Sequence, residues 1–130
     1  MQTASYIKLF HPSVVPQKDP RLREITLGQL DGMLKTEVKQ LYPEKKHSTR
    51  SSRFDFSDVG GESRIQVIQR YVAFFDDVVS TLGITRGRCL PNIVVVGHGT
   101  ALRIFLEHLG IPCQLEQGHY QRIMWEKGAF

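Results

Sequence analysis

The stretch NIVVVGHGTALRIFLEHLG, Asn92 to Gly110, joins two patterns that together decide the expected fold. Ile93 to Val96 is an uninterrupted apolar run of strand length, which is typical of a strand buried on both faces of a parallel sheet. From Thr100 the apolar residues follow a helical period that ends at Gly110. The members of this helical face are Ala101, Leu102, Phe105, Leu106 and Leu109. The stretch therefore predicts a buried strand followed directly by a helix.

A single histidine, His98, stands between Gly97 and Gly99 where the predicted strand meets the predicted helix. In open parallel sheets, ligands bind at the carboxyl ends of the strands, and flanking glycines allow close approach of the backbone. A helix that begins at Thr100 adds free N–H groups and the positive end of its dipole, which favour a phosphate oxygen. The pattern favours an anion site, although a histidine at a strand end can equally be a satisfied structural residue.

The segments before this stretch are expected to include two shorter helices. Ala4, Ile7 and Phe10 predict a helix that stops at His11, because the residue before a proline is disfavoured in the α region. A second helical period runs from Leu30 to Leu41 and ends before a proline.

A long helix with a broad apolar face is the clearest local element. It follows Glu44 to Gly61, a polar, serine-rich stretch expected to be a loop that covers a site or carries little structure. Ser63 and Gln66 match a capping box at the helix start, and Gly83 is a suitable terminator. The expected face consists of Ile65, Ile68, Val72, Phe75, Val79 and Leu82, widened by Val67, Tyr71, Phe74 and Val78. Such a wide face predicts a helix packed on a sheet.

Composition limits the classes of protein. At 130 residues, with 41% hydrophobic and 23% charged residues, the chain is expected to form one globular domain rather than to be disordered. The net charge of +4 favours anionic partners, but the basic residues are spread along the chain, which argues against nucleic acid as a partner. No stretch approaches the roughly 20 apolar residues that cross a membrane, and no signal peptide is evident. We expect a soluble, cytoplasmic protein with no membrane contact.

Neither the cysteines nor the remaining histidines indicate a metal or a cofactor. Cys89 and Cys113 lack the spacing of a metal or redox site and are expected to be reduced thiols. The other four histidines lack matched ligand spacing. They are His11, His47, His108 and His119, of which His108 is expected on the exposed side of the last helix. We expect no metal and no cofactor.

Further motifs occur in a fixed order along the chain. DPRLREITLGQLDGM places Leu22, Glu24, Gly28 and Gly32 in an L-x-E-x-x-x-G-x-x-x-G frame, and GGES, Gly60 to Ser63, precedes the long helix. With VVVGHGTALR, these segments in this order resemble the histidine phosphatase superfamily, which has the phosphoglycerate mutase-like fold. The resemblance spans nearly the whole chain, from the QTA segment near the start to about residue 110.

The resemblance implies a three-layer α/β/α sandwich with a mostly parallel sheet, and phosphoryl transfer through a phosphohistidine. It places His98 at the family's second, non-nucleophilic histidine, which binds a phosphoryl oxygen, with Gly99 and Thr100 beside it as phosphate contacts. It places Glu24 at the general acid/base carboxylate. Without the family frame, Glu24 is a solvated surface charge and Thr100 a helix N-cap. The G-E-S segment borders the pocket in the family, although a capping role for its serine is equally well supported here.

One family motif has no counterpart in this sequence. The nucleophilic histidine of the family lies in an R-H-G motif on the first strand, and the sequence contains no R-H-G. The resemblance therefore implies that residues 1–130 form a single, truncated domain, incomplete at its N-terminus. Loss of a strand leaves unpaired backbone and apolar surface, so self-association or a partner that covers the incomplete sheet is expected. A truncated gene product, an engineered fragment and pairing with another chain are all open explanations.

Three functions follow from these observations. The first, which we favour, is a phosphatase or mutase of the family that acts on a phosphorylated small molecule or phosphoprotein, with this chain inactive or incomplete. The second is a non-catalytic phosphate-binding or protein-interaction module of the same fold. The third is an unrelated α/β binding domain. For the first function we expect Glu24 and His98 to converge on one polar pocket at the carboxyl end of Ile93 to Val96.

Overall fold

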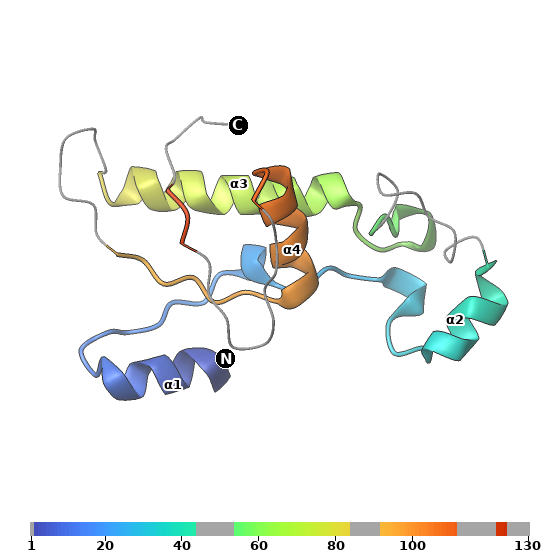
Figure 1. Ribbon diagram of the computed structural model, residues 1–130, viewed down its shortest axis with the longest axis horizontal. Helices are drawn as coiled ribbons and strands as arrows, with labels where there is room; N and C mark the ends of the chain where they lie inside the picture. Colours follow the sequence, from blue (N-terminus) through green and yellow to red (C-terminus); the bar gives the residue numbers. More distant parts are fainter. Residues whose placement is uncertain (1, 44–53, 84–91, 112–121, 125–130) are drawn as a thin grey trace.

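The computed structural model describes residues 2–43, 54–83, 92–111 and 122–124 (Figure 1). Four α-helices follow one another along these residues: α1 (Gln2–Phe10), α2 (Lys35–Leu41), α3 (Arg64–Thr81) and α4 (Gly99–His108). Three short 3-10 turns lie between them: η1 (Pro20–Leu22), η2 (Gly28–Leu30) and η4 (Ser57–Val59). Within the described ranges, no helix is both long enough and apolar enough to cross a membrane.

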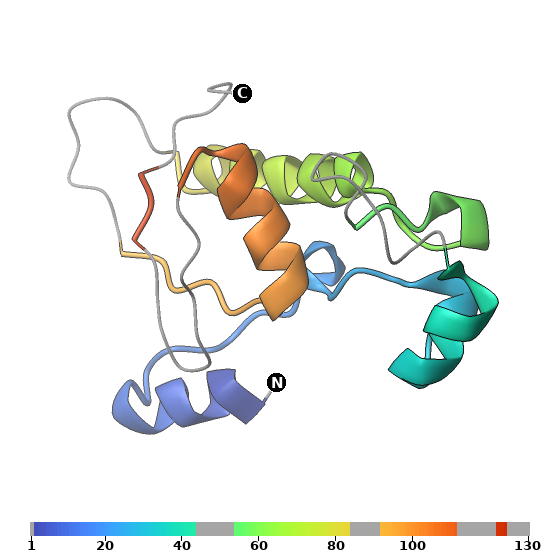
Figure 2. The same ribbon diagram turned by 45° about the vertical axis from the view of Figure 1, so that its right-hand side comes forward.

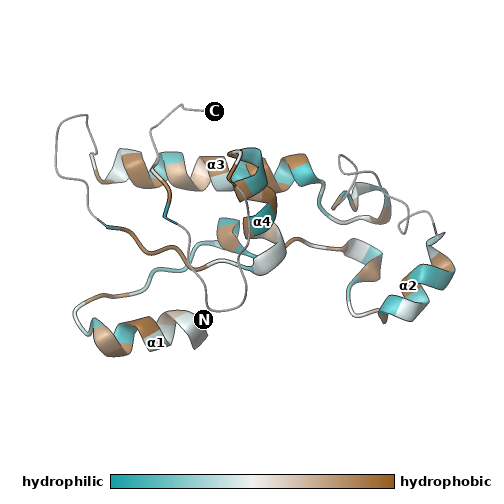
Figure 3. Ribbon diagram, in the orientation of Figure 1, coloured by the Kyte–Doolittle hydropathy of each residue, from teal (hydrophilic) through white to brown (hydrophobic). Residues whose placement is uncertain are grey.

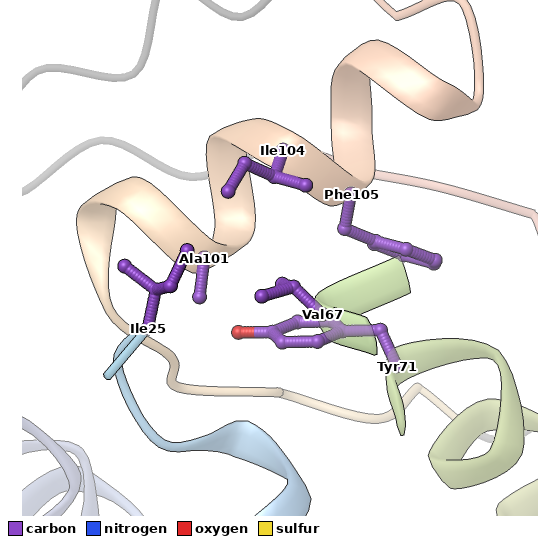
Figure 4. Close-up of a cluster of buried hydrophobic side chains, with 6 residues drawn as sticks. All are labelled: Ile25, Val67, Tyr71, Ala101, Ile104 and Phe105. Carbon is purple, nitrogen blue, oxygen red and sulfur yellow. The ribbon is translucent and has the colours of Figure 1, made fainter. Parts of the chain in front are cut away.

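The core lies where α4 packs against α3. Figure 4 shows the side chains that fill this contact, together with one from the segment that follows η1. The buried cluster consists of Ile25, Val67, Tyr71, Ala101, Ile104 and Phe105. The Phe105 ring stacks on Phe75 with centroids 5.2 Å apart and lies 5.0 Å from the ring of Tyr71. Figures 1 and 2 show α1 below this helix pair and α2 at its right-hand end, and neither helix supplies a residue to the buried cluster.

Helix α3 begins and ends as its sequence predicts. The Ser63 hydroxyl accepts a hydrogen bond from the Gln66 amide at 3.2 Å, and the Gln66 side chain accepts one from the Ser63 amide at 2.8 Å. This confirms the capping box. At the other end Gly83 has φ +58°, a conformation that glycine adopts readily. The buried residues are Val67, Tyr71, Phe74 and Val79. Part of the expected face is exposed, with Ile65 at 66% and Leu82 at 50%, because only one side of α3 meets α4.

The expected α/β/α sandwich with a parallel sheet is wrong for the residues that the structure describes, which contain no strand. Residues 92–98 are extended and lead into α4, as the orange trace in Figure 1 shows. Ile93 and Val94 are 46% and 70% exposed rather than buried on two faces. A strand requires a neighbouring extended segment that shares backbone hydrogen bonds. An apolar run in the sequence indicates side chains suited to burial, but it does not specify which segment would pair with the strand.

The shorter helices agree with the sequence in part. Helix α1 ends at Phe10, as predicted from the proline that follows. The second helix, α2, begins at Lys35 rather than at Leu30, because the chain turns at Gly32, which has φ +84°. Figure 3 shows hydrophobic residues on α1 and along the middle of the extended segment that leads into α4. In the predicted loop, residues 54–61 are described and contain η4, whereas residues 44–53 lie outside the described ranges.

Several expectations fall on parts of the chain that the structure does not describe. These concern Cys89, Cys113, His47 and His119. His108, in contrast, is described and lies on the exposed side of α4, as expected.

Candidate functional site

The candidate site is built on the first turn of α4. His98 is the N-cap residue of this helix, with extended backbone angles of φ −109° and ψ 151°. Its carbonyl accepts the first bond of the helix from the Leu102 amide at 2.9 Å, but its side chain makes no capping bond and is exposed. The first amide groups of a helix have no partner within the helix, so another acceptor is needed there.

Glu24 supplies that acceptor from a distant part of the chain. Its carboxylate accepts hydrogen bonds from the Thr100 amide at 3.2 Å and from the Ala101 amide at 2.8 Å. It also accepts a bond of 2.9 Å from the amide of Ile25, the next residue in the chain. The carboxylate therefore lies at the positive end of the α4 dipole, where a negative charge is stabilised. Glu24, which lies 76 positions before Thr100, therefore caps the helix in place of the His98 side chain.

The structure thus brings the predicted site residues to one helix start. Glu24, Gly99 and Thr100 lie at the first turn of α4, and His98 immediately precedes it. The contact runs from the Glu24 carboxylate to the α4 backbone, while the His98 side chain stays exposed. Of the residues predicted to contact phosphate, Thr100 therefore has its amide already bonded to Glu24. The catalytic and phosphate-binding roles of these residues stay predictions.

A buried tyrosine lies beneath this helix start. Tyr71 is fully buried, and Figure 4 shows its hydroxyl directed to the side where Ile25 and Ala101 lie. Among the residues that the structure describes, the hydroxyl oxygen has no hydrogen-bond partner. Burial raises the pKa of Tyr71 to about 12; the Arg70 charge opposes this rise and the Glu24 carboxylate adds to it.

Gly97 allows the extended segment to approach this tyrosine. A Cβ at position 97 would lie 2.9 Å from the Tyr71 hydroxyl, closer than such atoms normally come. The glycine before His98 is therefore explained by packing against α3. The presence of Gly97 in the G-H-G motif therefore does not by itself indicate a ligand site.

Sequence reasoning missed a second cluster, which holds the segment carrying Glu24. The Arg70 guanidinium donates to the carbonyls of Arg21 at 2.5 Å and Arg23 at 2.9 Å, and to the Glu62 carboxylate at 3.0 and 3.2 Å. The sequence did contain a signal for this cluster. Arg70 lies three residues after Val67, on the inner side of α3, and a charged residue in such a position needs polar partners. The Arg70 side chain is only 9% exposed.

The G-E-S segment has a structural role in this cluster. The Glu62 amide donates to the Thr26 carbonyl at 2.8 Å, and the Glu62 carboxylate accepts from the Thr26 amide at 3.1 Å. Gly28 and Gly61 permit this contact, since a Cβ on Gly28 would collide with the Val59 carbonyl and one on Gly61 would lie 2.5 Å from the Thr26 carbonyl. The conformation of Gly28, with φ +64°, is also one that other residues rarely adopt.

Comparison with known proteins finds a family whose model matches the chain. The model of the histidine phosphatase superfamily (branch 1) matches residues 1–128. No curated protein and no solved structure gives a significant match.

Proposed function

Since this chain belongs to the histidine phosphatase superfamily, we propose that Glu24 and the start of α4 form the acid–base and phosphate-contacting part of a phosphomonoester site. The observation that supports this proposal is that the Glu24 carboxylate binds the amides of the first turn of α4. This turn directly follows His98 in the sequence. An acid–base group and a histidine beside a helix N-terminus suit a reaction in which negative charge develops on a phosphoryl group.

Each residue has a defined role in this proposal. The imidazole of His98, the amide of Gly99 and the hydroxyl of Thr100 bind oxygens of the phosphoryl group. As the P–O bond to the leaving group breaks, Glu24 donates a proton to the leaving oxygen. When water then attacks the phosphorylated nucleophile, Glu24 takes a proton from that water. The nucleophile of the family is the histidine of the R-H-G motif, which these 130 residues do not contain.

Without that nucleophile, we expect the chain by itself to bind phosphomonoesters without hydrolysing them. Acid–base assistance contributes about 10²–10⁴-fold to a reaction rate. Enzymes that hydrolyse phosphate monoesters reach accelerations of up to about 10²¹-fold. The remaining factor is too large for Glu24 and His98 to supply. The substrate class in the proposal is a phosphorylated small molecule or a phosphoprotein, an anion in keeping with the net charge of +4.

The lack of an R-H-G motif also favours a second candidate function. In this alternative the chain is a phosphate-binding or protein-interaction module in which Glu24 only caps α4. The two proposals differ in what happens when the family's nucleophile is supplied. A chain that carries an added R-H-G segment hydrolyses a phosphomonoester under the first proposal and does not under the second.

The first experiment measures binding and phosphate release together. Phenyl phosphate is titrated into the isotope-labelled chain while backbone amide NMR signals are followed, and free phosphate is assayed in parallel. We expect shifts at His98, Gly99 and Thr100, no phosphate release above background, and loss of the shifts in His98→Ala. His108→Ala is the matched control, because it alters an exposed histidine at the other end of α4 and should keep the shifts.

Two outcomes contradict the proposal. Shifts that persist in His98→Ala, or that never reach the start of α4, would remove the phosphate site from this helix. Phosphate release that disappears in His98→Ala would show that His98 or a group dependent on it acts as the nucleophile.

A further inference from the structure

We propose that Arg70 and Glu62 are positioning residues for Glu24, and that together they hold residues 21–26 so that the Glu24 carboxylate reaches α4. The importance of this placement for a reaction rests on the proposed function, which makes Glu24 the acid–base group. The placement itself rests only on contacts in the structure and is tested separately.

Arg70 holds the backbone before and at Glu24. One terminal nitrogen of its guanidinium donates to the carbonyls of Arg21 and Arg23, and the other lies 3.4 Å from the Glu24 carbonyl. A planar guanidinium presents several N–H donors in fixed directions, so a single side chain can bond several carbonyls of one segment. Arg70 itself is fixed by α3, the longest helix of the described residues.

Glu62 holds the backbone directly after Glu24. Its carboxylate accepts a bond from the Thr26 amide, and its own amide donates to the Thr26 carbonyl. The same carboxylate accepts two bonds from Arg70 and a 2.6 Å bond from the half-exposed Arg23 side chain. The Glu62 side chain is only 12% exposed, which makes these charge-assisted bonds less screened than surface pairs.

These bonds leave Glu24 little freedom to move away from α4. Its own carbonyl faces Arg70, the side chain of Ile25 is buried in the core, and the Thr26 amide is bonded to Glu62. With the chain held on both sides, the Glu24 side chain is directed to the α4 amides rather than left free in solvent. If the Arg70–Glu62 pair served only to join α3 to a loop, its two side chains would not need to bond the peptide groups on both sides of Glu24.

Amide hydrogen exchange of the full chain, followed by NMR, tests this proposal. In the wild type, the Thr100 and Ala101 amides should be protected by their bonds to Glu24. In Arg70→Gln we expect their exchange to speed up by about 10- to 100-fold relative to Phe105, as for the loss of hydrogen bonds to a charged acceptor. Glu24→Ala, which removes the acceptor directly, should show the same selective loss.

Arg64→Gln is the matched control. Arg64 lies on the same helix and pairs with Glu107 at 3.0 Å, so its substitution also removes a half-buried charge from α3. A general loss of stability would speed exchange throughout α4 in both variants, whereas a positioning role affects Thr100 and Ala101 in Arg70→Gln only. Unchanged exchange in Arg70→Gln, or equal selective loss in Arg64→Gln, would overturn the proposal.

A second variant covers the case in which Arg70→Gln does not fold. Glu62→Gln keeps one acceptor for the Thr26 amide but loses the charged pair with Arg70. Selective loss of protection at Thr100 and Ala101 in this variant supports the proposal, and unchanged protection refutes it. Because no phosphate is added, the result is independent of whether the site binds phosphomonoesters.

Discussion

At the scale of single residues, the Tyr71 hydroxyl is a buried polar atom that we expect to lower stability. It is fully covered and finds no hydrogen-bond partner within the described part of the chain, and an unsatisfied buried group of this kind costs about 1–3 kcal/mol. The ring itself packs on Phe105, and phenylalanine preserves this contact. We therefore expect Tyr71→Phe to raise the free energy of unfolding by about 1 kcal/mol at neutral pH, as measured by urea denaturation. A lower stability for this variant would show that the hydroxyl has a favourable partner.

The same hydroxyl predicts a loss of stability at high pH. Burial raises the pKa of Tyr71 to about 12, whereas an unfolded tyrosine has a pKa of about 10. Between these values the unfolded chain loses the proton and the folded chain keeps it, so stability falls as pH rises and is unaffected below pH ~10. The decline amounts to at most about 2.7 kcal/mol, from two pKa units.

Denaturation at pH 9, 10 and 11 measures this decline, and Tyr71→Phe should reduce it. Tyr6→Phe is the matched control, since Tyr6 is 68% exposed on α1 and its substitution should leave the pH dependence as in the wild type. An identical slope in Tyr71→Phe and wild type would show that other groups cause the decline.

At the scale of elements, the start of α3 depends on a local cap and the start of α4 on a distant one. Ser63 and Gln66 satisfy each other's amides within one turn. We expect Ser63→Ala to lower the free energy of unfolding by about 1 kcal/mol in urea denaturation, the usual effect of losing an N-cap. Ser80→Ala is the control, because the Ser80 hydroxyl donates to the Asp76 carbonyl within the helix and caps nothing. Equal effects of the two substitutions would contradict a special role for the cap.

At the scale of the whole molecule, the buried core of the described residues lies where α3 meets α4, and we expect stability to depend mainly on this contact. Phe105 is fully buried between them, whereas Phe10 at the end of α1 is 82% exposed. We expect Phe105→Ala to lower the free energy of unfolding by about 3–5 kcal/mol, because it leaves a cavity in the core. The same substitution at Phe10 should change it by less than about 0.5 kcal/mol. Comparable losses at both positions, measured by urea denaturation, would mean that α1 belongs to the cooperative core.

The sequence by itself was sufficient for features that depend on neighbouring residues. The capping box at Ser63, the end of α1 before a proline and the end of α3 at Gly83 were all predicted, because caps and turn conformations are set by a few adjacent residues. The order of the motifs also sufficed to identify the superfamily, which the family model confirms.

The family resemblance predicted that Glu24 lies near His98, but only the tertiary structure decided which atoms of distant residues form bonds. The predicted strand at Ile93 to Val96 has no strand partner in the described ranges, and a ladder requires a second segment that the apolar pattern cannot specify. The bonds of Glu24 to α4 and of Arg70 to residues 21–24 join positions about 46 to 77 apart. No local pattern encodes such contacts, because they depend on how α3, α4 and the segment after η1 pack. The core therefore determines where the Glu24 carboxylate lies.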